Sequence, residues 1–219
     1  MKFIRLLSIF VILAIGGGVF LFNGIRDKIE WDKPHGDLET LTEKDLYVGR
    51  FVEGEIYELW DEFAYTSEYD TTLGIQTSKE RKTDRYFALP LEYSFYGDND
   101  LMFVAVSSRR SDELKVFEKM EKETLDYYNG LDYNEYTTTH FVGKVQKLSG
   151  EYLGFFRKYI ARIYKVSEAD ASEYYAPYVL VSYANPDGIV TFIVIGAVMT
   201  FLGVVGTVNL IIRKVIRGK

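Results

Sequence analysis

Residues 189–212 read IVTFIVIGAVMTFLGVVGTVNLII, a stretch of 24 residues that contains no charged side chain. A helix rises about 1.5 Å per residue, so roughly 20 apolar residues cross a hydrocarbon core of about 30 Å. Before the stretch, Asn185 is a good helix cap and Pro186 suits a first helical position. The sequence therefore predicts a C-terminal transmembrane helix over residues 185–212. The basic tail over residues 213–219 is then expected in the cytoplasm, following the positive-inside rule.

A second apolar run, from Leu6 to Phe22, follows the basic residues Lys2 and Arg5. A cleavable signal peptide has the same order of features. However, the run is long for a signal core, and no Ala-x-Ala motif ends it. These observations favour an uncleaved signal-anchor helix over residues 1–25. With both termini in the cytoplasm, the chain is expected to be a two-span plasma-membrane protein whose partner is the lipid bilayer.

The region between the two apolar runs is acidic. All 32 acidic residues lie there, whereas 6 of the 26 basic residues flank the apolar runs and leave 20, so this region carries a charge of about −12. Such a charge repels nucleic-acid phosphates and anionic headgroups, so no nucleic-acid partner is expected. The absence of cysteine excludes disulfides, thiolate metal sites and cysteine nucleophiles.

The central region divides into a stalk and a domain. Residues 26–42 are charged and show no periodicity, which is typical of a stalk, and residues 43–184 are expected to form an extracytoplasmic α+β domain. Segments rich in β-branched and aromatic residues predict strands over 46–60, 62–69, 85–95, 101–108, 140–148 and 178–183. Pro90 is expected at a sheet edge or a bulge, and residues 71–84 are expected to form a loop.

Two helices are expected between these strands. Apolar periodicity predicts them over residues 111–128 and 151–165. In the first, one face is formed by Leu114, Phe117, Glu121, Leu125 and Tyr128. Bent strands with glycine bulges indicate a small, partly open OB-like β-barrel with two or three helices, and a flatter mixed sheet is the alternative.

Small residues recur along both apolar runs. Their spacing of three or four places them on one stripe of each helix, and such stripes let helix backbones approach closely in lipid. The stripe residues are Ala14, Gly18, Gly196, Thr200, Gly203 and Thr207. The stripe is expected to join helices within one chain, to a second copy or to a partner protein. Because neither helix core contains an ionisable residue, a transporter or voltage sensor is not expected.

All 18 tyrosines lie in the central region, and some are grouped. An aromatic binding face for a peptide, glycan or protein is one interpretation. The alternative is that these rings are buried while their hydroxyls stay wet, which is ordinary for tyrosine. The candidate face comprises Tyr127, Tyr128, Tyr133, Tyr136, Tyr174, Tyr175 and Tyr178.

Motifs for catalysis or cofactor binding are missing from the sequence. There is no phosphate-binding glycine loop, no Gly-x-Ser-x-Gly and no His-Glu-x-x-His. The two histidines, His35 and His140, are unrelated in spacing, and Asp98 and Asp100 fit a solvated turn better than a calcium loop. No cofactor or metal is predicted. The leading hypothesis is a membrane-anchored binding or scaffolding module that is not an enzyme, and the alternative is an envelope enzyme with a carboxylate pair in a barrel groove.

Four stretches carry a resemblance to a known family. They are VGRFVEGEIYELWDEFA (48–64), RYFALPL (85–91), THFVGKVQKLSGEYLGFFRKYI (139–160) and YAPYVLVSY (175–183). Together they resemble an uncharacterised family of bacterial double-spanning membrane proteins, domain of unknown function 6709. The resemblance implies a membrane location and an extracytoplasmic domain, and it implies no activity, cofactor or functional residue.

Overall fold

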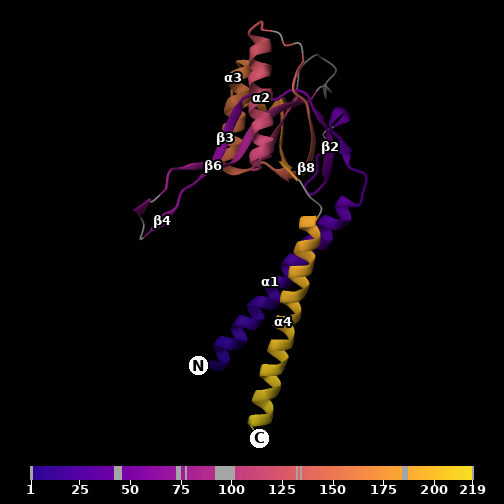
Figure 1. The fold of residues 1–219 in the computed structure, drawn as a ribbon, viewed down its shortest axis with the longest axis vertical. Coiled ribbons are helices and arrows are strands. Elements are labelled where there is room, and N and C mark those ends of the chain that lie inside the picture. Colours follow the sequence, from indigo (N-terminus) through magenta and orange to yellow (C-terminus); the bar gives the residue numbers. More distant parts are fainter. Residues whose placement is uncertain are drawn as a thin grey trace. The chain divides into compact units, whose positions relative to one another are not determined.

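The computed structural model describes residues 2–41, 46–72, 75–76, 78–91, 102–131, 133, 135–183 and 187–218. The chain forms two compact units (Figure 1). One, the helix pair, combines residues 1–34 with 184–219, and the other, the sheet unit, spans His35–Tyr183. The predicted cap residues Asn185 and Pro186 lie outside the described residues.

The helix pair consists of α1 (Lys2–Trp31) and α4 (Asp187–Arg217). Both helices are long and apolar enough to cross a membrane. They run antiparallel, with the two chain ends at the same end of the pair (Figure 1). Near one end the Phe20 and Phe192 rings stack at 5.8 Å, and near the other Lys214 Nζ lies 4.6 Å from the centre of the Phe3 ring.

The sheet unit is built on one sheet of seven strands in the order β1-β2-β8-β9-β7-β6-β3. The strands are β1 (Gly36–Asp37), β2 (Phe51–Ile56), β3 (Glu62–Glu68), β6 (Arg81–Leu91), β7 (Met102–Ser108), β8 (Thr139–Lys147) and β9 (Tyr175–Ser182). Two pairs, β1–β2 and β7–β9, are parallel, and the others are antiparallel. A separate ribbon is formed by β4 (Thr71–Thr72) and β5 (Ile75–Gln76).

Within the described residues the sheet is open, with β1 and β3 as its end strands. The predicted OB-like barrel is therefore not confirmed, whereas the α+β class and the alternative of a mixed sheet agree with the structure. The predicted stalk region, 26–42, contains the last turns of α1, then β1 and a short 3-10 helix, η1 (Leu38–Thr40). The sheet thus begins earlier in the chain than its apolar patterning indicates.

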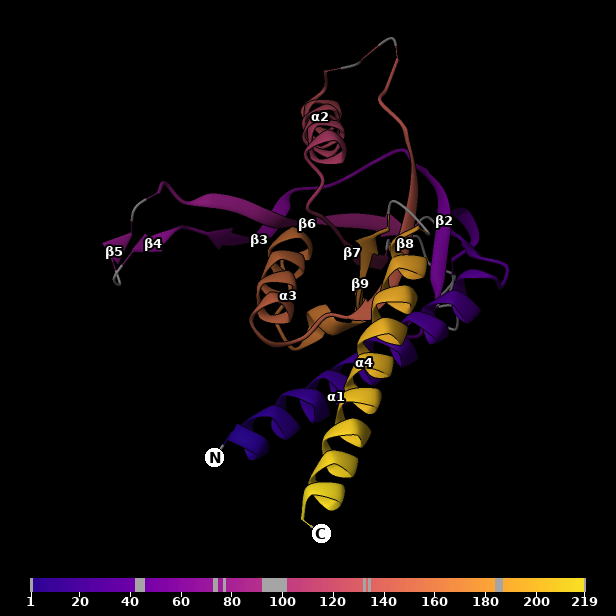
Figure 2. The same ribbon diagram turned by 60° about the horizontal axis from the view of Figure 1, so that its bottom comes forward.

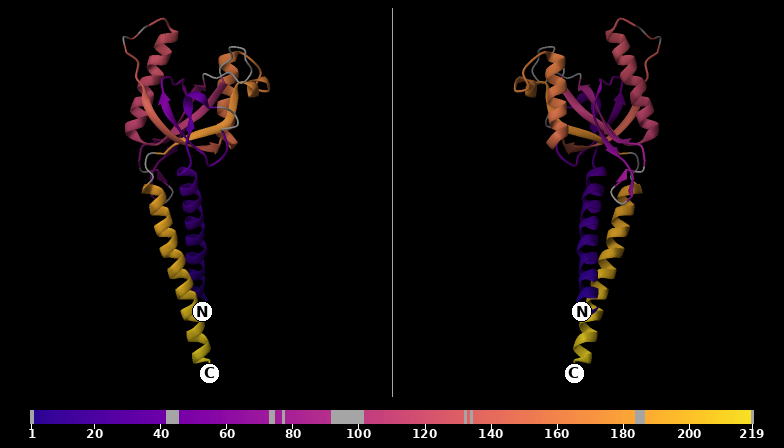
Figure 3. Two further views of the ribbon diagram at one scale, coloured as in Figure 1. Left: turned by 90° about the vertical axis from the view of Figure 1, so that its right-hand side faces the viewer. Right: turned by 90° about the vertical axis from the view of Figure 1, so that its left-hand side faces the viewer.

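Two helices cover opposite faces of the sheet (Figures 2 and 3). On one face α2 (Ser111–Tyr128) inserts Phe117, whose ring lies 5.6 Å from the Phe87 ring. On the other face α3 (Gly150–Tyr164) inserts Phe156, whose ring lies 5.2 Å from the Tyr175 ring. A second 3-10 helix, η3 (Asp170–Glu173), precedes β9. Alternate residues of β6 and β7 therefore feed two separate apolar clusters, as the pleat requires.

Some local predictions differ from the structure. β6 begins at Arg81, inside the predicted loop 71–84, because the polar start of the strand pairs with β3. Pro90 lies in an interior strand, yet the β3–β6 pairing extends only to Phe87, so Pro90 has a paired strand on the β7 side alone. A proline without an N–H is tolerated there because no ladder bond is needed on the open side.

The face of α2 agrees with the prediction at Leu114 and Phe117, which pack against the core, and differs in its last turns. The helix buries Phe117, Met120 and Thr124, whereas Leu125 and Tyr128 are 39% and 56% exposed. Threonine at the buried position hides this face from an apolar pattern. The predicted end of the helix is confirmed by Gly130, whose φ of 84° is the left-handed conformation that glycine adopts easily.

Candidate functional site

The helix pair is held by direct backbone contact at glycines. A Cβ atom added to Gly203 would lie 2.4 Å from the Ala14 amide nitrogen, and one added to Gly196 would lie 2.4 Å from the Leu21 nitrogen. Real Cβ atoms do not come this close to backbone atoms. Any side chain at either position would therefore force the two backbones apart.

Other stripe residues are placed unequally. A Cβ atom at Gly17 would lie 2.5 Å from the Thr200 nitrogen, whereas one at Gly18 would meet no atom within 4 Å. The Thr200 hydroxyl donates a hydrogen bond to the Gly196 carbonyl at 2.7 Å, and the Thr207 hydroxyl is buried. The seam on α1 therefore passes through Ala14 and Gly17. Spacing alone did not single out Gly17, because three consecutive glycines occupy positions 16–18.

The candidate tyrosines lie in separate places. Four surround the end of α2: the Tyr127 ring lies 5.6 Å from that of Tyr128 and 6.1 Å from that of Tyr136, and Tyr133 lies 5.7 Å from Tyr136. Tyr127 and Tyr128 are each 56% exposed. This group is a local aromatic surface.

Tyr128 connects this surface to a carboxylate. Its ring lies 4.9 Å from Trp60, and its hydroxyl donates to Glu58 at 3.3 Å. Burial, the Glu58 charge and this hydrogen bond raise the pKa of Tyr128 to about 12. The hydroxyl therefore stays protonated at neutral pH and can donate its hydrogen bond to Glu58.

The other three tyrosines do not join that surface. Tyr174 stacks on Tyr164 at 4.1 Å, and Tyr175 is buried against α3 and accepts a hydrogen bond from Arg157 Nε at 3.2 Å. Both pack in the cluster on the α3 face of the sheet. Tyr178 packs in the cluster on the α2 face. The seven residues are thus divided among three locations, and only the group at the end of α2 is a shared surface.

A groove runs between the end strand β3 and helix α3. It consists of two adjoining hollows, of about 590 and 320 Å³, that share Glu62, Phe63 and Phe155. Phe63 packs its ring 4.6 Å from Phe156, and Phe155 is 40% exposed beside it. The groove therefore has an aromatic centre that water reaches.

Charges differ between the two ends of the groove. Glu80, Glu151 and Lys82 line the hollow along Ala64 to Ser67, where Lys82 is paired with Glu62. Lys158 and Arg162 line the hollow beside Glu62. Lys158 and Arg162 are in the later turns of α3. They lie at the Glu62 end of β3 because the helix and the strand run antiparallel. The groove is therefore acidic at one end and basic at the other.

The carboxylate shared by both hollows is already neutralised. Glu62 lies 2.8 Å from Lys82 Nζ and forms an ion pair with Arg85, which also pairs with Glu118. The Glu62 amide donates to Glu121 at 2.8 Å. Burial is the largest cause that raises the pKa of Glu121, and the nearby Asp61 and Glu62 charges add to it. The Glu62 amide bond to Glu121 and the Arg85–Glu118 ion pair tie α2 to β3 and β6.

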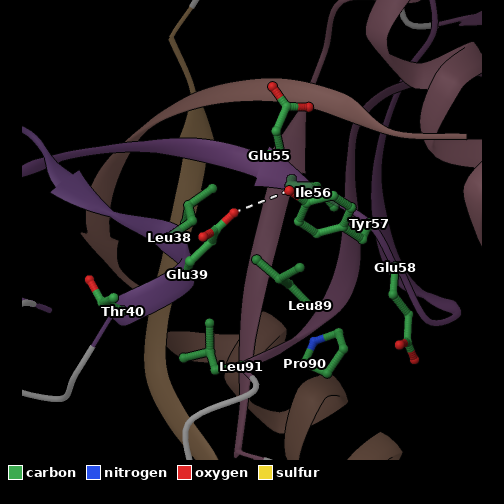
Figure 4. Close-up of a pocket in the computed structure, with 10 residues that line it drawn as sticks. All are labelled: Leu38, Glu39, Thr40, Glu55, Ile56, Tyr57, Glu58, Leu89, Pro90 and Leu91. Carbon is green, nitrogen blue, oxygen red and sulfur yellow. Dashed lines mark hydrogen bonds between the residues drawn. The ribbon is translucent and has the colours of Figure 1, made fainter.

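A second cavity, of about 370 Å³, lies beside η1 (Figure 4). Its apolar floor includes Leu89 and Leu91, and the Tyr57 hydroxyl donates to Glu39 at 3.1 Å across its rim. The Glu55 carboxylate points away from it in Figure 4 and lies 3.3 Å from His140. None of the described residues that line the cavity is a histidine, cysteine, serine or lysine.

The two histidines contact different carboxylates. His35 Nδ1 is 2.9 Å from Glu53, and His140 belongs to the contact with Glu55. Among the described residues no three His, Cys, Asp or Glu side chains are grouped to hold a metal ion. Asp98 and Asp100, considered for calcium, lie outside the described residues.

The comparison with protein families covers nearly the whole chain. A family model matches residues 2–212, a span that includes α1, the sheet unit and most of α4. The chain belongs to the family described as Domain of unknown function (DUF8577). This match fits the expected uncharacterised family, whereas the resemblance to domain of unknown function 6709 is not confirmed. No curated protein matches the chain.

Proposed function

We propose that the protein is a membrane-anchored binding or scaffolding module that holds its sheet unit outside the cytoplasm on two transmembrane helices. The helix pair carries this proposal. Gly17, Gly196 and Gly203 lie in the seam between the two helices. The outward side chains, including Ile12, Phe22 and Phe201, are 66–68% exposed. An apolar surface of this extent needs a cover, and hydrocarbon tails supply one along the full length of both helices.

The proposed topology places both termini in the cytoplasm and residues 30–185 outside. The antiparallel pair brings the chain ends to one side, which agrees with the basic residues at both ends: Lys2, Arg5, Arg213, Lys214, Arg217 and Lys219. The seam also supports retention of α1. Cleavage as a signal peptide would leave Gly196 and Gly203 without the backbone they contact.

Binding is favoured over catalysis by the groove between β3 and α3. It offers aromatic surface and separated charges, which suit recognition. The alternative of an envelope enzyme would use Glu62 and Glu121, but Glu62 is held by Lys82 and Arg85, and Glu121 accepts a backbone hydrogen bond. A general acid or base needs a carboxyl group that reaches substrate.

Protease protection tests the topology. The full chain, with a different epitope tag at each end, is expressed in bacteria, and protease is added to spheroplasts. We expect both tags to survive on short fragments while the sheet unit is degraded, because only that unit is outside. Loss of either tag without lysis contradicts the model, and so does a mature protein that lacks residues 6–25 in mass spectrometry.

A further inference from the structure

We propose that the free edge of β3 and its groove bind an extended peptide segment of a partner protein. The segment adds to the sheet antiparallel to β3, and it places acidic groups against Lys158 and Arg162. This inference rests on the proposed binding function and names the class of partner.

The first support is the strand edge. Within the described residues, β3 is an end strand that pairs with β6 alone, and it is seven residues long, whereas the opposite end strand, β1, has two. An end strand presents N–H and C=O groups to any extended chain that approaches. Strand addition at such an edge gives a peptide affinity through its backbone and selectivity through pockets for its side chains.

The second support is a bulge that shapes the groove. Glu62 pairs with Phe87 and Ala64 with Tyr86, so Phe63 is an extra residue in β3. The bulge accompanies the contact of the Phe63 ring with α3, and it interrupts regular pairing at that end of the strand. A second shift, between Tyr65 and Ser67, leaves the extra residue on β6 and not on β3. Backbone pairing with a peptide is therefore expected along Ala64–Glu68, and the peptide side chain beyond it is expected on Phe63 and Phe155.

The third support is charge complementarity, which sets the order of charges in an antiparallel peptide. A segment antiparallel to β3 starts at Glu68 and ends at Glu62, so its carboxyl-terminal side reaches Lys158 and Arg162. Arg162 also lies 3.5 Å from Asp61, and the basic end still carries one excess cation. The amino-terminal side reaches Glu80 and Glu151. A peptide with basic residues first and acidic residues last therefore matches both ends.

A second copy of this chain fits the edge less well. In an antiparallel pair of β3 strands, Glu62 of each copy would lie at the end of the other strand that carries Glu68, beside Glu80 and Glu151 of that groove. Like charges directly opposite one another destabilise a strand pair. The observations therefore favour a foreign segment over self-association.

Synthetic peptides test the proposal on the full chain in detergent micelles. Peptide A is Lys-Lys-Thr-Val-Thr-Val-Phe-Asp-Asp with a fluorescent label, and peptide B exchanges the lysines and the aspartates. A third peptide is A with alternate backbone amides methylated, which blocks strand pairing but keeps every side chain. By fluorescence anisotropy we expect A to bind about tenfold more tightly than B and than methylated A, a difference of about 1.4 kcal/mol.

Two protein variants sharpen the test. The double variant Lys158→Glu, Arg162→Glu is expected to prefer B over A, and Phe155→Ser is expected to weaken both. Tyr127→Ser, on α2 with a comparably exposed ring, is the control and should bind like the wild type. Because Lys158 and Arg162 are both exposed, the circular dichroism spectrum of the double variant should match that of the wild type.

Several results would overturn the proposal. These are equal binding of A and B, no effect of methylation, or dissociation constants above about 1 mM for all peptides. A concentration-dependent dimer that Glu68→Lys alters would assign the edge to a second copy. The measurement in micelles does not depend on topology, so a failed protease-protection experiment and a failed peptide experiment are distinguishable.

Discussion

At the scale of single residues, Glu123 shows how a buried carboxylate stabilises a connection. Its side chain is 8% exposed, and it accepts hydrogen bonds from the Thr137 amide at 2.7 Å and the Thr137 hydroxyl at 3.0 Å. Burial would raise the pKa of Glu123, but these hydrogen bonds and the Lys119 charge outweigh burial and lower it. Glu123 thereby attaches helix α2 to the segment around Thr137, which leads into β8.

Glu123→Ala should lower the free energy of unfolding by about 1–3 kcal/mol at pH 7, because the Thr137 amide loses its acceptor. A carboxylate with a lowered folded pKa contributes stability above its unfolded pKa, about 4.3, and loses it as pH falls through the folded value. The difference from the wild type should therefore shrink below about pH 4. Urea unfolding followed by tryptophan fluorescence measures it.

The exposed Glu135 offers a matched control for this prediction. Glu135→Ala should change the unfolding free energy by less than about 0.5 kcal/mol at any pH. If the Glu123→Ala deficit is the same at pH 7 and below pH 4, the carboxylate does not stabilise the fold through its charged form.

Among the helices and strands, the sequence predicts the bounds of an element better than the face that it buries. β7, α2 and α3 were predicted within a few residues, because their periodicity and turn residues lie inside each segment. The predicted face of α2 is right at Leu114 and Phe117 and wrong at Leu125, which is exposed while Thr124 is buried. The start of β6 was missed because its polar residues are stabilised by pairing with β3, which no local pattern contains.

Substitutions in the helix seam test the element-scale packing. Gly203→Leu should separate α1 from α4, since its Cβ would lie 2.7 Å from the Phe10 carbonyl oxygen. Gly17→Leu should do the same from the other helix. Resonance energy transfer between labels on the two helices of one chain, in detergent or lipid, should fall for both variants while membrane insertion is retained.

Neighbouring positions provide the controls. Val204 is 49% exposed, and Gly18 has open space around it, so Val204→Leu and Gly18→Leu should keep the transfer efficiency of the wild type. Equal behaviour of Gly17→Leu and Gly18→Leu would show that the seam does not hold the pair. If Gly203→Leu lowers energy transfer only between labels on two different chains, and not within one chain, the stripe joins two copies in a dimer.

At the scale of the whole molecule, the open sheet was beyond the sequence because its order depends on distant segments. β9 lies between β7 and β8, although α3 and η3 separate it from β8 in the chain. Strand patterns reveal that a segment pairs but not with which partner. The groove was missed for the same reason, because β3 and α3 meet only in the fold.

The division into two units predicts that residues 35–183 fold without the helix pair. Both apolar clusters of the sheet are made by residues within this range, so the fragment should be soluble and should melt cooperatively. Circular dichroism with heating measures the transition. The matched fragment 35–174 lacks β9 and should not melt cooperatively; a cooperative melt of this shorter fragment would contradict the sheet order.

The position of β9 in the chain also determines when the sheet can be completed during synthesis. The central strand of the sheet emerges from the ribosome just before α4, so the sheet and the helix pair become complete at almost the same moment. Before β9 and α4 are made, the glycine face of α1 has no helix to pack against, and β7 and β8 have no strand between them. A chain that terminates before β9 therefore lacks both the complete sheet and the helix pair, and its unpaired segments are open to the cell's proteases.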